Sequence, residues 1–301
     1  MKIYDCFMFF DEEVLLDLRL NIMDRYVSKF IITEATYTHS GQPKNLTFDI
    51  KKFKKFANKI IYIPVDDPPP TLLTINENDD EKVKGEKLIL NGYKRDNYQR
   101  QMLQKGLVNA NPEDLIFISD IDEIPNLEEI NLGEIKNKLI FFKQKMFYYK
   151  FNLFYESFPW YGTKACKNKH FLTPQWLRNI KYKKYPLWRL DIIFSKRKYN
   201  TIYLVENGGW HFTSVKSPED IEKKLLNFAH HYDYEKSGIK SNELKKMIKE
   251  KKVFYDHNVD KKKNKWKGSS ILKPLDLSEM PGYLSQNYKK YSDWLELDIR
   301  D

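Results

Sequence analysis

The segment LIFISDIDEIP (115–125) places three carboxylates directly after an apolar run that is typical of a buried strand. Neighbouring carboxylates repel one another and lose hydration on burial, so Asp120, Asp122 and Glu123 need a solvated edge, counter-charges or a metal ion. Asp120 and Asp122 are two residues apart and point to the same side of an extended chain. Two hard oxygen ligands on one side suit Mg²⁺ or Mn²⁺ that also holds phosphate groups. A solvated strand end beside a helix is the alternative, and it is the more frequent case for this short motif taken alone.

The segment NGGWHFTS (207–214) combines a turn with two side chains of chemical interest. Gly208 and Gly209 allow a sharp turn or a close approach of the backbone to a ligand. His211 could bind a metal ion, transfer a proton or pack in the core, and the last is commonest for an isolated histidine. Trp210 could support a sugar ring, although a tryptophan is more often a core residue. The segment is therefore a candidate part of a site whose chemistry stays open.

Cations and aromatic residues form two further candidate groups. In RDNYQRQMLQKGL, Arg95 and Arg100 lie about a turn and a half apart on a predicted helix, so they flank one face rather than share it. Arg95 could bind a diphosphate with two guanidinium donors, or it could be an ordinary surface charge. The segments FPWYGTKAC (158–166) and YPLWRL (185–190) set aromatic rings beside Lys and Arg. They could stack on sugar rings or bases, and a second hydrophobic cluster explains them equally well.

Alternating strand and helix patterns in the first half of the chain would position these groups. The predicted strands are 2–10, 29–36, 59–65 and 115–119. The main predicted helices are 11–27, with Asp11 as its N-cap, and 87–108. A long polar loop over 66–86, with three successive prolines, separates the third predicted strand from the second helix. This alternation predicts a mostly parallel sheet covered by helices, and ligands of such sheets bind at the carboxyl ends of the strands, where Asp120 to Glu123 would lie.

The second half of the chain is less regular. A strand is predicted over 139–152, and segment 200–214 is predicted to be a strand that runs into a Gly-Gly turn and a Trp-His pair. The aromatic segments between them are predicted to be rich in loops. Ser217 is the predicted N-cap of a helix with Pro218 at its first position. The chain after residue 240 is rich in lysine and is predicted to form short helical pieces.

Composition limits the class of protein and its partners. The 301 residues are 41% hydrophobic, which is enough for a sizeable core, and 52 Lys and Arg against 42 Asp and Glu give a net charge of +10. That charge favours anionic partners such as nucleic acid, an acidic membrane surface or a phosphorylated substrate. The lysines gather in runs such as KKKNKWK (261–267) that alternate with acidic stretches. This is typical of solvated faces, so we expect no specific binding of nucleic acid.

The sequence also predicts a compartment. Cys6 and Cys166 give no disulfide framework and fit a reducing environment. The N-terminal apolar run contains Asp5 and lacks a small-residue cleavage site, so it is not typical of a signal peptide. No window approaches the ~18 apolar residues of a membrane span. We therefore expect a soluble, cytoplasmic protein.

Seven segments occur in a characteristic order along the chain. They are YDCFMFFDE, FIITEATYTHSGQPK, RDNYQRQML, FISDIDEIP, WYGTKA, GGWHFT and NFAHH. In this order they resemble glycosyltransferase family 17, from residue 2 to about 235, with a weaker similarity at 280–291. That family includes the β-1,4-mannosyl-glycoprotein N-acetylglucosaminyltransferase that adds bisecting GlcNAc, together with bacterial and viral members.

The resemblance implies a GT-A-like fold, an α/β/α sandwich with a mostly parallel central sheet. It divides the chain into a transferase domain over 1–239 and a helical, lysine-rich extension over 240–301. Within the domain, 1–125 would bind the nucleotide sugar and 126–239 would lie on the acceptor side. The implied activity is a metal-dependent, inverting transfer of a sugar from a nucleotide sugar to a glycan hydroxyl. The expected donor is UDP-GlcNAc, and the expected cofactor is Mn²⁺ or Mg²⁺.

Site residues follow from the resemblance position by position. Asp120 and Asp122 match its DxD segment and become metal and diphosphate residues, and His211 is the candidate for a further metal ligand. The other candidate donor-binding residues are Glu34 and Thr36 near the nucleobase and ribose, Arg95 and Arg100 near the phosphates, and Trp210. A divalent ion and basic side chains would stabilise the charge that develops on the departing diphosphate.

Inversion also requires a carboxylate that takes the proton of the acceptor hydroxyl, opposite the leaving group. Asp120 and Asp122 would be occupied by the metal ion, so this base must lie elsewhere. The candidates are Glu156, Asp191 and Glu206, which are near the aromatic acceptor-side segments, and Glu123. All four stay open at this point.

Two other functions are compatible with the same residues. A metal-dependent phosphohydrolase or nuclease would use the same acids and basic surface, but such enzymes typically show more clustered His and Asp ligands. A non-catalytic sugar- or nucleic-acid-binding protein would keep the carboxylates as a structural strand end.

The Golgi members of the family carry an N-terminal membrane anchor, whereas this chain begins almost at its first predicted strand. We therefore expect an enzyme that builds a polysaccharide, a lipid-linked glycan or a viral glycan, with a basic tail able to contact an anionic membrane.

Overall fold

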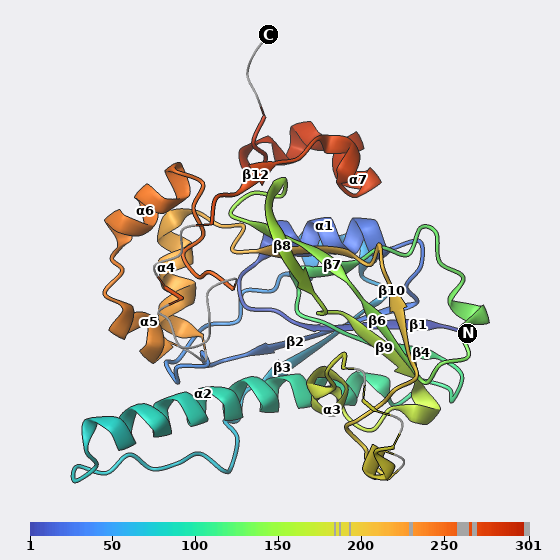
Figure 1. The fold of residues 1–301 in the computed structure, drawn as a ribbon, viewed down its shortest axis with the longest axis horizontal. Helices are drawn as coiled ribbons and strands as arrows, with labels where there is room; N and C mark the ends of the chain where they lie inside the picture. Colours follow the sequence, from blue (N-terminus) through green and yellow to red (C-terminus); the bar gives the residue numbers. More distant parts are fainter. Residues whose placement is uncertain are drawn as a thin grey trace.

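Two β-sheets with helices packed around them form the protein (Figure 1). The structure is a computed structural model, and it describes residues 1–183, 185–186, 188–192, 194–228, 231–257, 265–266 and 270–297, without the side chains of Ser157 and Leu190. Most of the lysine run at 261–267, one residue of YPLWRL and two of NFAHH lie outside these residues. Within the described part, no helix is both long enough and apolar enough to cross a bilayer.

The larger sheet has the strand order β10-β6-β9-β4-β1-β2-β3. Its strands are β1 (Ile3–Met8), β2 (Lys29–Ala35), β3 (Ile60–Val65), β4 (Leu115–Ile118), β6 (Leu139–Phe142), β9 (Lys164–Lys167) and β10 (Ile202–Val205). Strand β9 runs antiparallel to both of its neighbours, and the other pairs are parallel. The mostly parallel sheet predicted from the alternating patterns is confirmed.

Helices cover both faces of this sheet (Figure 1). The helices are α1 (Glu13–Met23), α2 (Glu81–Met102), α3 (Pro174–Asn179), α4 (Pro218–Asn227), α5 (His231–Ser237), α6 (Ser241–Lys249) and α7 (Gly282–Gln286). Short 3₁₀ helices are η1 (Ile50–Phe56), η2 (Leu103–Leu107), η3 (Leu132–Glu134), η4 (Asn168–His170), η5 (Leu190–Ile192), η6 (Leu277–Glu279) and η7 (Tyr288–Trp294). Because side chains alternate along a strand, Phe7 packs in the α1 core and Cys6 packs in the core that contains Leu103 on the opposite face. The predicted α/β class is therefore confirmed.

The smaller sheet has the order β12-β8-β7-β11-β5. Its strands are β5 (Glu123–Pro125), β7 (Gln144–Tyr148), β8 (Leu153–Trp160), β11 (Gly209–Thr213) and β12 (Lys273–Pro274). Strand β11 lies between β5 and β7, and its pairing with β5 sets His211 opposite Glu123. Gly209 has φ +113°, and a Cβ there would lie 2.2 Å from the carbonyl oxygen of Ile124. Glycine is therefore required at this turn, and the turn sets the register that brings the two site segments together.

Some predicted boundaries are wrong. Helix α1 begins at Glu13 with Glu12 rather than Asp11 at its N-cap, and no side chain caps it. Instead, the Glu12 carboxylate accepts hydrogen bonds from the backbone N–H groups of Phe10 and Asp11. Helix α2 begins at residue 81 rather than 87. The Asp80 side chain caps this start by accepting a hydrogen bond from Val83 N at 2.8 Å.

Two further expectations about the second half were tested by the structure. The segment 158–166, expected to be rich in loops, contributes to β8 and β9 instead. By contrast, the Ser217 cap of α4 is confirmed.

Residues after 240 share the cores of the rest of the chain. Leu244 and Phe254 pack with Tyr148 of β7, whereas Leu284 and Tyr291 pack in the core beside α1. Short helical pieces do occur in this part, at α6 and α7. The predicted division of the chain at residues 239 and 240 stays a prediction.

A buried ion pair supports the carboxylate segment. Asp5 on β1 and Arg19 on α1 have no exposed side-chain surface, and 2.6 Å separates Asp5 Oδ1 from Arg19 Nη2. Arg19 also donates hydrogen bonds to the chain after β4, at the carbonyl oxygens of Asp120, Ile121 and Glu123 and at Ser119 Oγ. The guanidinium group therefore holds the backbone of the segment that carries the candidate site.

We expect Arg19→Met to lower the free energy of unfolding by about 3–5 kcal/mol, because it leaves Asp5 buried without its cation. Chemical denaturation measures this change. The matched control is Arg25→Met, which breaks an exposed pair with Glu128 and should cost about 0–1 kcal/mol. Equal losses in the two variants would show that Arg19 contributes no more than a surface pair.

Candidate active site

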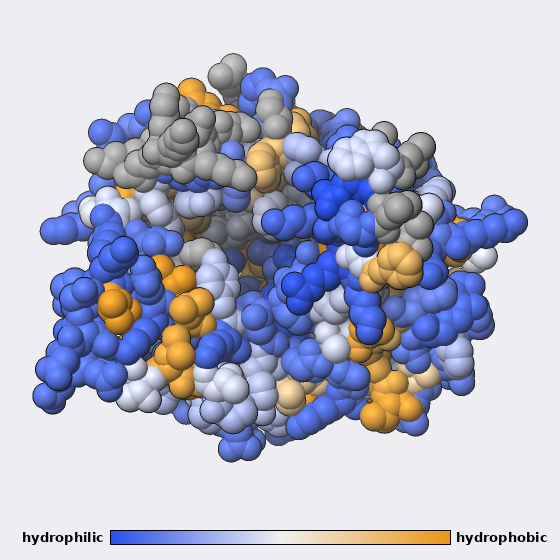
Figure 2. All heavy atoms as spheres, turned by 60° about the horizontal axis from the view of Figure 1, so that its bottom comes forward, coloured by the Kyte–Doolittle hydropathy of each residue, from blue (hydrophilic) through white to orange (hydrophobic). Residues whose placement is uncertain are grey.

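A pocket of about 880 Å³ opens where β1, β2 and β4 end. Its walls include Phe9 and Phe10 after β1, Ala35 at the end of β2, and Asp120 and Asp122 after β4. Side chains of α2, α3, α4 and β11 complete it. Figure 2 shows a hollow near the centre of this side of the molecule, with mainly hydrophilic residues around it. The carboxylates thus lie at the sheet edge where ligands of α/β proteins bind, as their position after a strand predicted.

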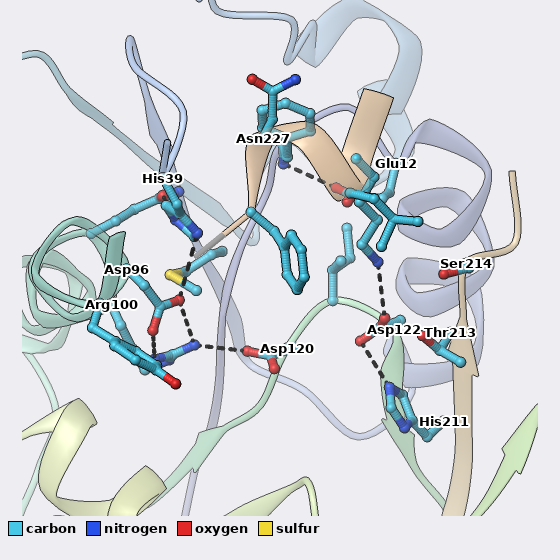
Figure 3. Close-up of a pocket in the computed structure, with 18 of the residues that line it drawn as sticks. Glu12, His39, Asp96, Arg100, Asp120, Asp122, His211, Thr213, Ser214 and Asn227 are labelled. Carbon is cyan, nitrogen blue, oxygen red and sulfur yellow. Dashed lines mark hydrogen bonds and ion pairs between the residues drawn. The ribbon is translucent and has the colours of Figure 1, made fainter. Parts of the chain in front are cut away.

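Arginines neutralise Asp120. Its Oδ1 accepts a hydrogen bond from Arg100 Nη2 at 3.1 Å, and its Oδ2 accepts one from Arg178 Nη2 at 2.6 Å. Burial raises the pKa of Asp120, but Arg178 and Arg100 outweigh burial and hold this pKa well below its usual range. Figure 3 shows the Arg100 side of this arrangement, with Asp96 held by the same guanidinium group. Asp120 therefore receives its counter-charge from protein side chains.

Glu123 is fully buried and supports Arg178. Both of its oxygens accept hydrogen bonds from the Arg178 guanidinium, at 2.7 and 2.8 Å. Its Oε1 also accepts from Trp160 Nε1 at 2.6 Å, and its Oε2 accepts from the backbone N–H of Asp120 at 2.8 Å. A bidentate pair of this kind fixes the plane of the guanidinium group. Both oxygens of Glu123 are therefore engaged in hydrogen bonds to Arg178 and to neighbouring groups of the site.

Asp122 faces His211 and Lys224. Its Oδ1 lies 3.6 Å from His211 Nε2, and its Oδ2 lies 3.8 Å from Lys224 Nζ. Burial raises the pKa of Asp122, but His211 outweighs burial and lowers it. The His211 ring stacks on Trp160, with 4.8 Å between the ring centroids, and its Nδ1 is buried without a hydrogen-bond partner among the described residues. Figure 3 shows Asp122 and His211 pointing toward one another, apart from the Arg100 group.

The residues present fit a divalent ion at the Asp122–His211 pair rather than at all three predicted ligands. Among the described residues, no group of three His, Cys, Asp or Glu side chains is arranged to hold a metal ion. Asp120 is occupied by its arginines. Asp122 and His211 offer one oxygen and one nitrogen ligand. The buried His211 Nδ1 has no hydrogen-bond partner among the described residues, so the histidine has one polar contact still to make. Mg²⁺ and Mn²⁺ commonly take only one or two protein ligands and complete their shell with phosphate oxygens and water.

A second buried cation lies behind Arg178. Lys164 Nζ donates hydrogen bonds to the carbonyl oxygens of Arg178 and Ile180 at the end of α3. Burial and the nearby Arg178 together lower the pKa of Lys164 to about 7, although Glu123 opposes this shift. Lys164 therefore holds the end of the short helix that presents Arg178.

The other end of the pocket is aromatic. The rings that line it include Tyr148, Trp160, Phe254, Tyr255, His257 and Trp266. Burial lowers the pKa of His257 to about 4, so this ring is neutral at pH 7. Aromatic faces without charge suit the apolar face of a sugar ring. The pocket thus joins a charged end to an aromatic end.

A comparison with known protein families identifies the family of the chain. The family model described as glycosyltransferase family 17 matches residues 1–295. The chain belongs to glycosyltransferase family 17. No curated protein matches the chain. Membership supports a glycosyltransferase function with a nucleotide-sugar donor and a glycan acceptor, and it favours this activity over the phosphohydrolase and the non-catalytic binding protein.

Of the residues predicted to bind the donor of this family 17 enzyme, Asp120 and Arg100 line the pocket. Glu34 is buried outside it and accepts hydrogen bonds from Thr47 and Phe48 N–H and from the Tyr62 hydroxyl. These contacts connect the strand end to the loop before η1.

The other three predicted donor-binding residues, Thr36, Arg95 and Trp210, do not line the pocket either. Thr36 Oγ1 donates to the carbonyl oxygen of Asp66 at 3.3 Å. Arg95 Nη1 donates to the carbonyl oxygen of His39 at 3.2 Å. Trp210 lies in the α1 core, on the opposite side of β11 from His211.

The acids proposed as the base of the family 17 reaction are not brought together. Glu156 is paired with Lys273, Asp191 with Arg189 and Lys198, and Glu206 with Lys143. All three acids are exposed, and none lines the pocket, whereas Glu123 lies beneath it. The described acids that do line it are Glu12, Asp96, Asp120, Asp122 and Asp233.

Sequence patterns missed Arg178 and Lys224 as site residues, and they indicated Trp160 only as part of the aromatic segment 158–166. Arg178 lies on the short helix α3, whose start is capped by Thr173 and marked by Pro174. That capping pattern could have revealed the helix, since it is a common helix start. Nothing local could have shown which side chain of α3 reaches Asp120, because 58 positions separate them in the chain.

Proposed function

We propose that the protein transfers N-acetylglucosamine from UDP-GlcNAc to a hydroxyl of a glycan acceptor, with inversion at the anomeric carbon. One observation carries this proposal. Asp120 and Asp122 lie at the strand edge in a pocket that joins a cationic end, suited to a nucleoside diphosphate, to an aromatic end, suited to a sugar. Family membership supplies the general activity, and the two ends supply a place for each substrate.

Three cations would serve the leaving diphosphate. Arg100 and Arg178 line the pocket but are largely engaged, since Arg100 donates to Asp96 and Asp120, and Arg178 donates to Glu123 and Asp120. Lys224 is different, because its nearest recorded partner is Asp122 at 3.8 Å, beyond hydrogen-bond distance. Its ammonium group is therefore the pocket cation best able to move to a phosphate oxygen. The two arginines keep Asp120 in place and add positive potential in a site of low dielectric.

Asp122 and His211 would hold the metal ion, Mn²⁺ or Mg²⁺. When bound, the ion would neutralise charge on the leaving diphosphate. Stacking on Trp160 fixes the His211 ring, and Trp160 is fixed in turn by its hydrogen bond to Glu123. The protein thus orients this pair through buried contacts.

The base would be one of the acids that line the pocket. Asp96 and Asp120 are held by arginines, and Asp122 is assigned to the metal ion. The other two described acids of the lining are Glu12, which precedes α1, and Asp233 of α5. Either one would accept the proton of the acceptor hydroxyl as the new glycosidic bond forms.

The proposal is tested by a screen of nucleotide sugars for slow hydrolysis of the donor with Mn²⁺, measured as released nucleotide. We expect UDP-GlcNAc to be turned over fastest, and no acceptor is needed because water replaces it. Glu12→Gln and Asp233→Asn are screened in parallel, and the variant that removes the base should lose about 100-fold or more in rate. Release of nucleotide from none of the sugars would contradict the transferase. Unchanged rates in both variants would contradict this choice of base.

A further inference from the structure

The segment between α3 and β10 exposes two large aromatic side chains. Trp188 is 79% exposed and Phe194 is 87% exposed. Single exposed hydrophobic residues are ordinary, but two nearly bare aromatic rings in one short loop leave much apolar surface in water. Neither residue lines the active-site pocket or the smaller pocket beside Tyr203. The rings therefore have no role in the site described above.

Specific contacts hold the base of this loop. The Asn200 side chain accepts a hydrogen bond from Tyr185 N at 3.0 Å and donates one to the Tyr185 carbonyl oxygen at 3.2 Å. On α3, Trp176 Nε1 donates to the carbonyl oxygen of Lys196, and its ring meets Tyr199 edge to face at 6.3 Å. These contacts close the loop and attach it to α3. The exposed rings thus project from an anchored element, which lies beside α3 at the lower right of Figure 1.

The loop is also strongly basic. Its described cations outnumber its one described acid, Asp191, which is already paired with Arg189 and Lys198. The described cations of the loop are Lys181, Lys183, Arg189, Lys196, Arg197 and Lys198. Positive charge around exposed aromatic rings is typical of a protein surface that binds an anionic lipid bilayer. Aromatic side chains settle among the headgroups, and Lys and Arg bind their negative charge.

We propose that this basic aromatic loop, through its described residues 181–183, 185–186, 188–192 and 194–200, docks the protein on an anionic membrane surface. Trp188 and Phe194 would enter the interfacial layer, and Lys196 and Arg197 would bind anionic headgroups. Single-stranded nucleic acid is the competing partner, but its binding surfaces use a groove that follows the strand. The described residues of this loop line neither pocket, and Trp188 and Phe194 are exposed. Because α3 also brings Arg178 into the active site, docking would place the membrane on the α3 side of the pocket.

Co-sedimentation with vesicles tests the proposal. The protein should bind vesicles of phosphatidylcholine with phosphatidylserine and not vesicles of phosphatidylcholine alone, and salt should weaken the binding. The double variant Trp188→Ala/Phe194→Ala should lose about tenfold in partition coefficient. Lys196→Glu/Arg197→Glu should lose more than about tenfold, since each basic residue near such a surface contributes about fivefold.

Val108→Ala is the matched control, because Val108 is 80% exposed but lies outside the loop. It should bind vesicles like the unchanged protein. Donor hydrolysis in solution should be the same in all these variants, so failure of this proposal leaves the proposed function untouched. No binding to anionic vesicles, or an equal loss in Val108→Ala, would overturn the docking surface. Binding of an oligonucleotide that removes the protein from vesicles and needs the same residues would assign the loop to nucleic acid instead.

Discussion

Replacing Lys224 by methionine should lower kcat/KM for hydrolysis of the nucleotide-sugar donor by about 100- to 1000-fold. The same replacement of Lys223 should leave it near the value of the unchanged protein. Both residues lie on α4, one position apart, so the two substitutions change the helix propensity and the net charge alike. Only Lys224 lines the pocket, whereas Lys223 is exposed to solvent. Release of nucleotide with Mn²⁺ measures the difference.

The expected effect of Lys224 rests on how the other cations are used. Arg178 already donates to the buried Glu123, and Arg100 already donates to the half-buried Asp96. Moving either arginine to a phosphate would leave its carboxylate unpaired. Moving Lys224 to a phosphate would leave no carboxylate unpaired, because its partner Asp122 would bind the metal ion when the donor binds. A preorganised cation aimed at developing negative charge is worth most where water is excluded.

Two further measurements distinguish a loss of catalysis in Lys224→Met from a loss of folding. The melting temperature of Lys224→Met should stay close to that of Lys223→Met, because Lys224 lies 3.8 Å from Asp122 and its removal breaks no ion pair of hydrogen-bond length. Lys224→Arg keeps the charge and should recover part of the rate. Equal rates in Lys224→Met and Lys223→Met would remove Lys224 from the reaction.

The strands of the first half and the sheet edge that carries the candidate site were predictable from the chain alone. Apolar runs ending in polar residues marked β2 and β4, and alternation with helices marked a parallel sheet. The same pattern also shows the limit of such prediction. Glu34 and Asp120 both follow a buried strand, yet Glu34 binds the loop before η1 while Asp120 faces the pocket. Which strand-end acid faces a ligand depends on the loops that fold over the edge, and local sequence does not encode their path.

The partners of the carboxylates could not be predicted for a related physical reason. His211 meets Glu123 through the register of β11 on β5, and that register depends on a glycine turn and on pairing between segments far apart in the chain. Arg178 reaches Asp120 from a helix of only one or two turns in a region expected to be rich in loops. Long-range pairing of this kind is a property of the packed molecule, so the charged environment of Asp120 appears only in three dimensions.

The separate surroundings of the two aspartates predict that they respond differently to the same substitution. Asp122→Asn should weaken binding of Mn²⁺ in the presence of UDP by about 100-fold, and it should lower donor hydrolysis by about 1000-fold. Asp120→Asn should leave binding of Mn²⁺ within a few-fold of its original strength, because both oxygens of Asp120 are engaged by Arg100 and Arg178. It should instead lower the melting temperature, since it removes the charge that those buried arginines require.

Electron paramagnetic resonance of free Mn²⁺ during a titration measures the affinity without any turnover, and thermal unfolding measures the stability. His211→Ala should lose Mn²⁺ affinity together with Asp122→Asn, because the two side chains form one ligand pair. His231→Ala is the matched control, since His231 is also buried but its Nδ1 donates to the carbonyl oxygen of Phe228. If Asp120→Asn abolished Mn²⁺ binding while Asp122→Asn preserved it, the ion would belong to Asp120, and the arginines would have to leave that carboxylate when the metal binds.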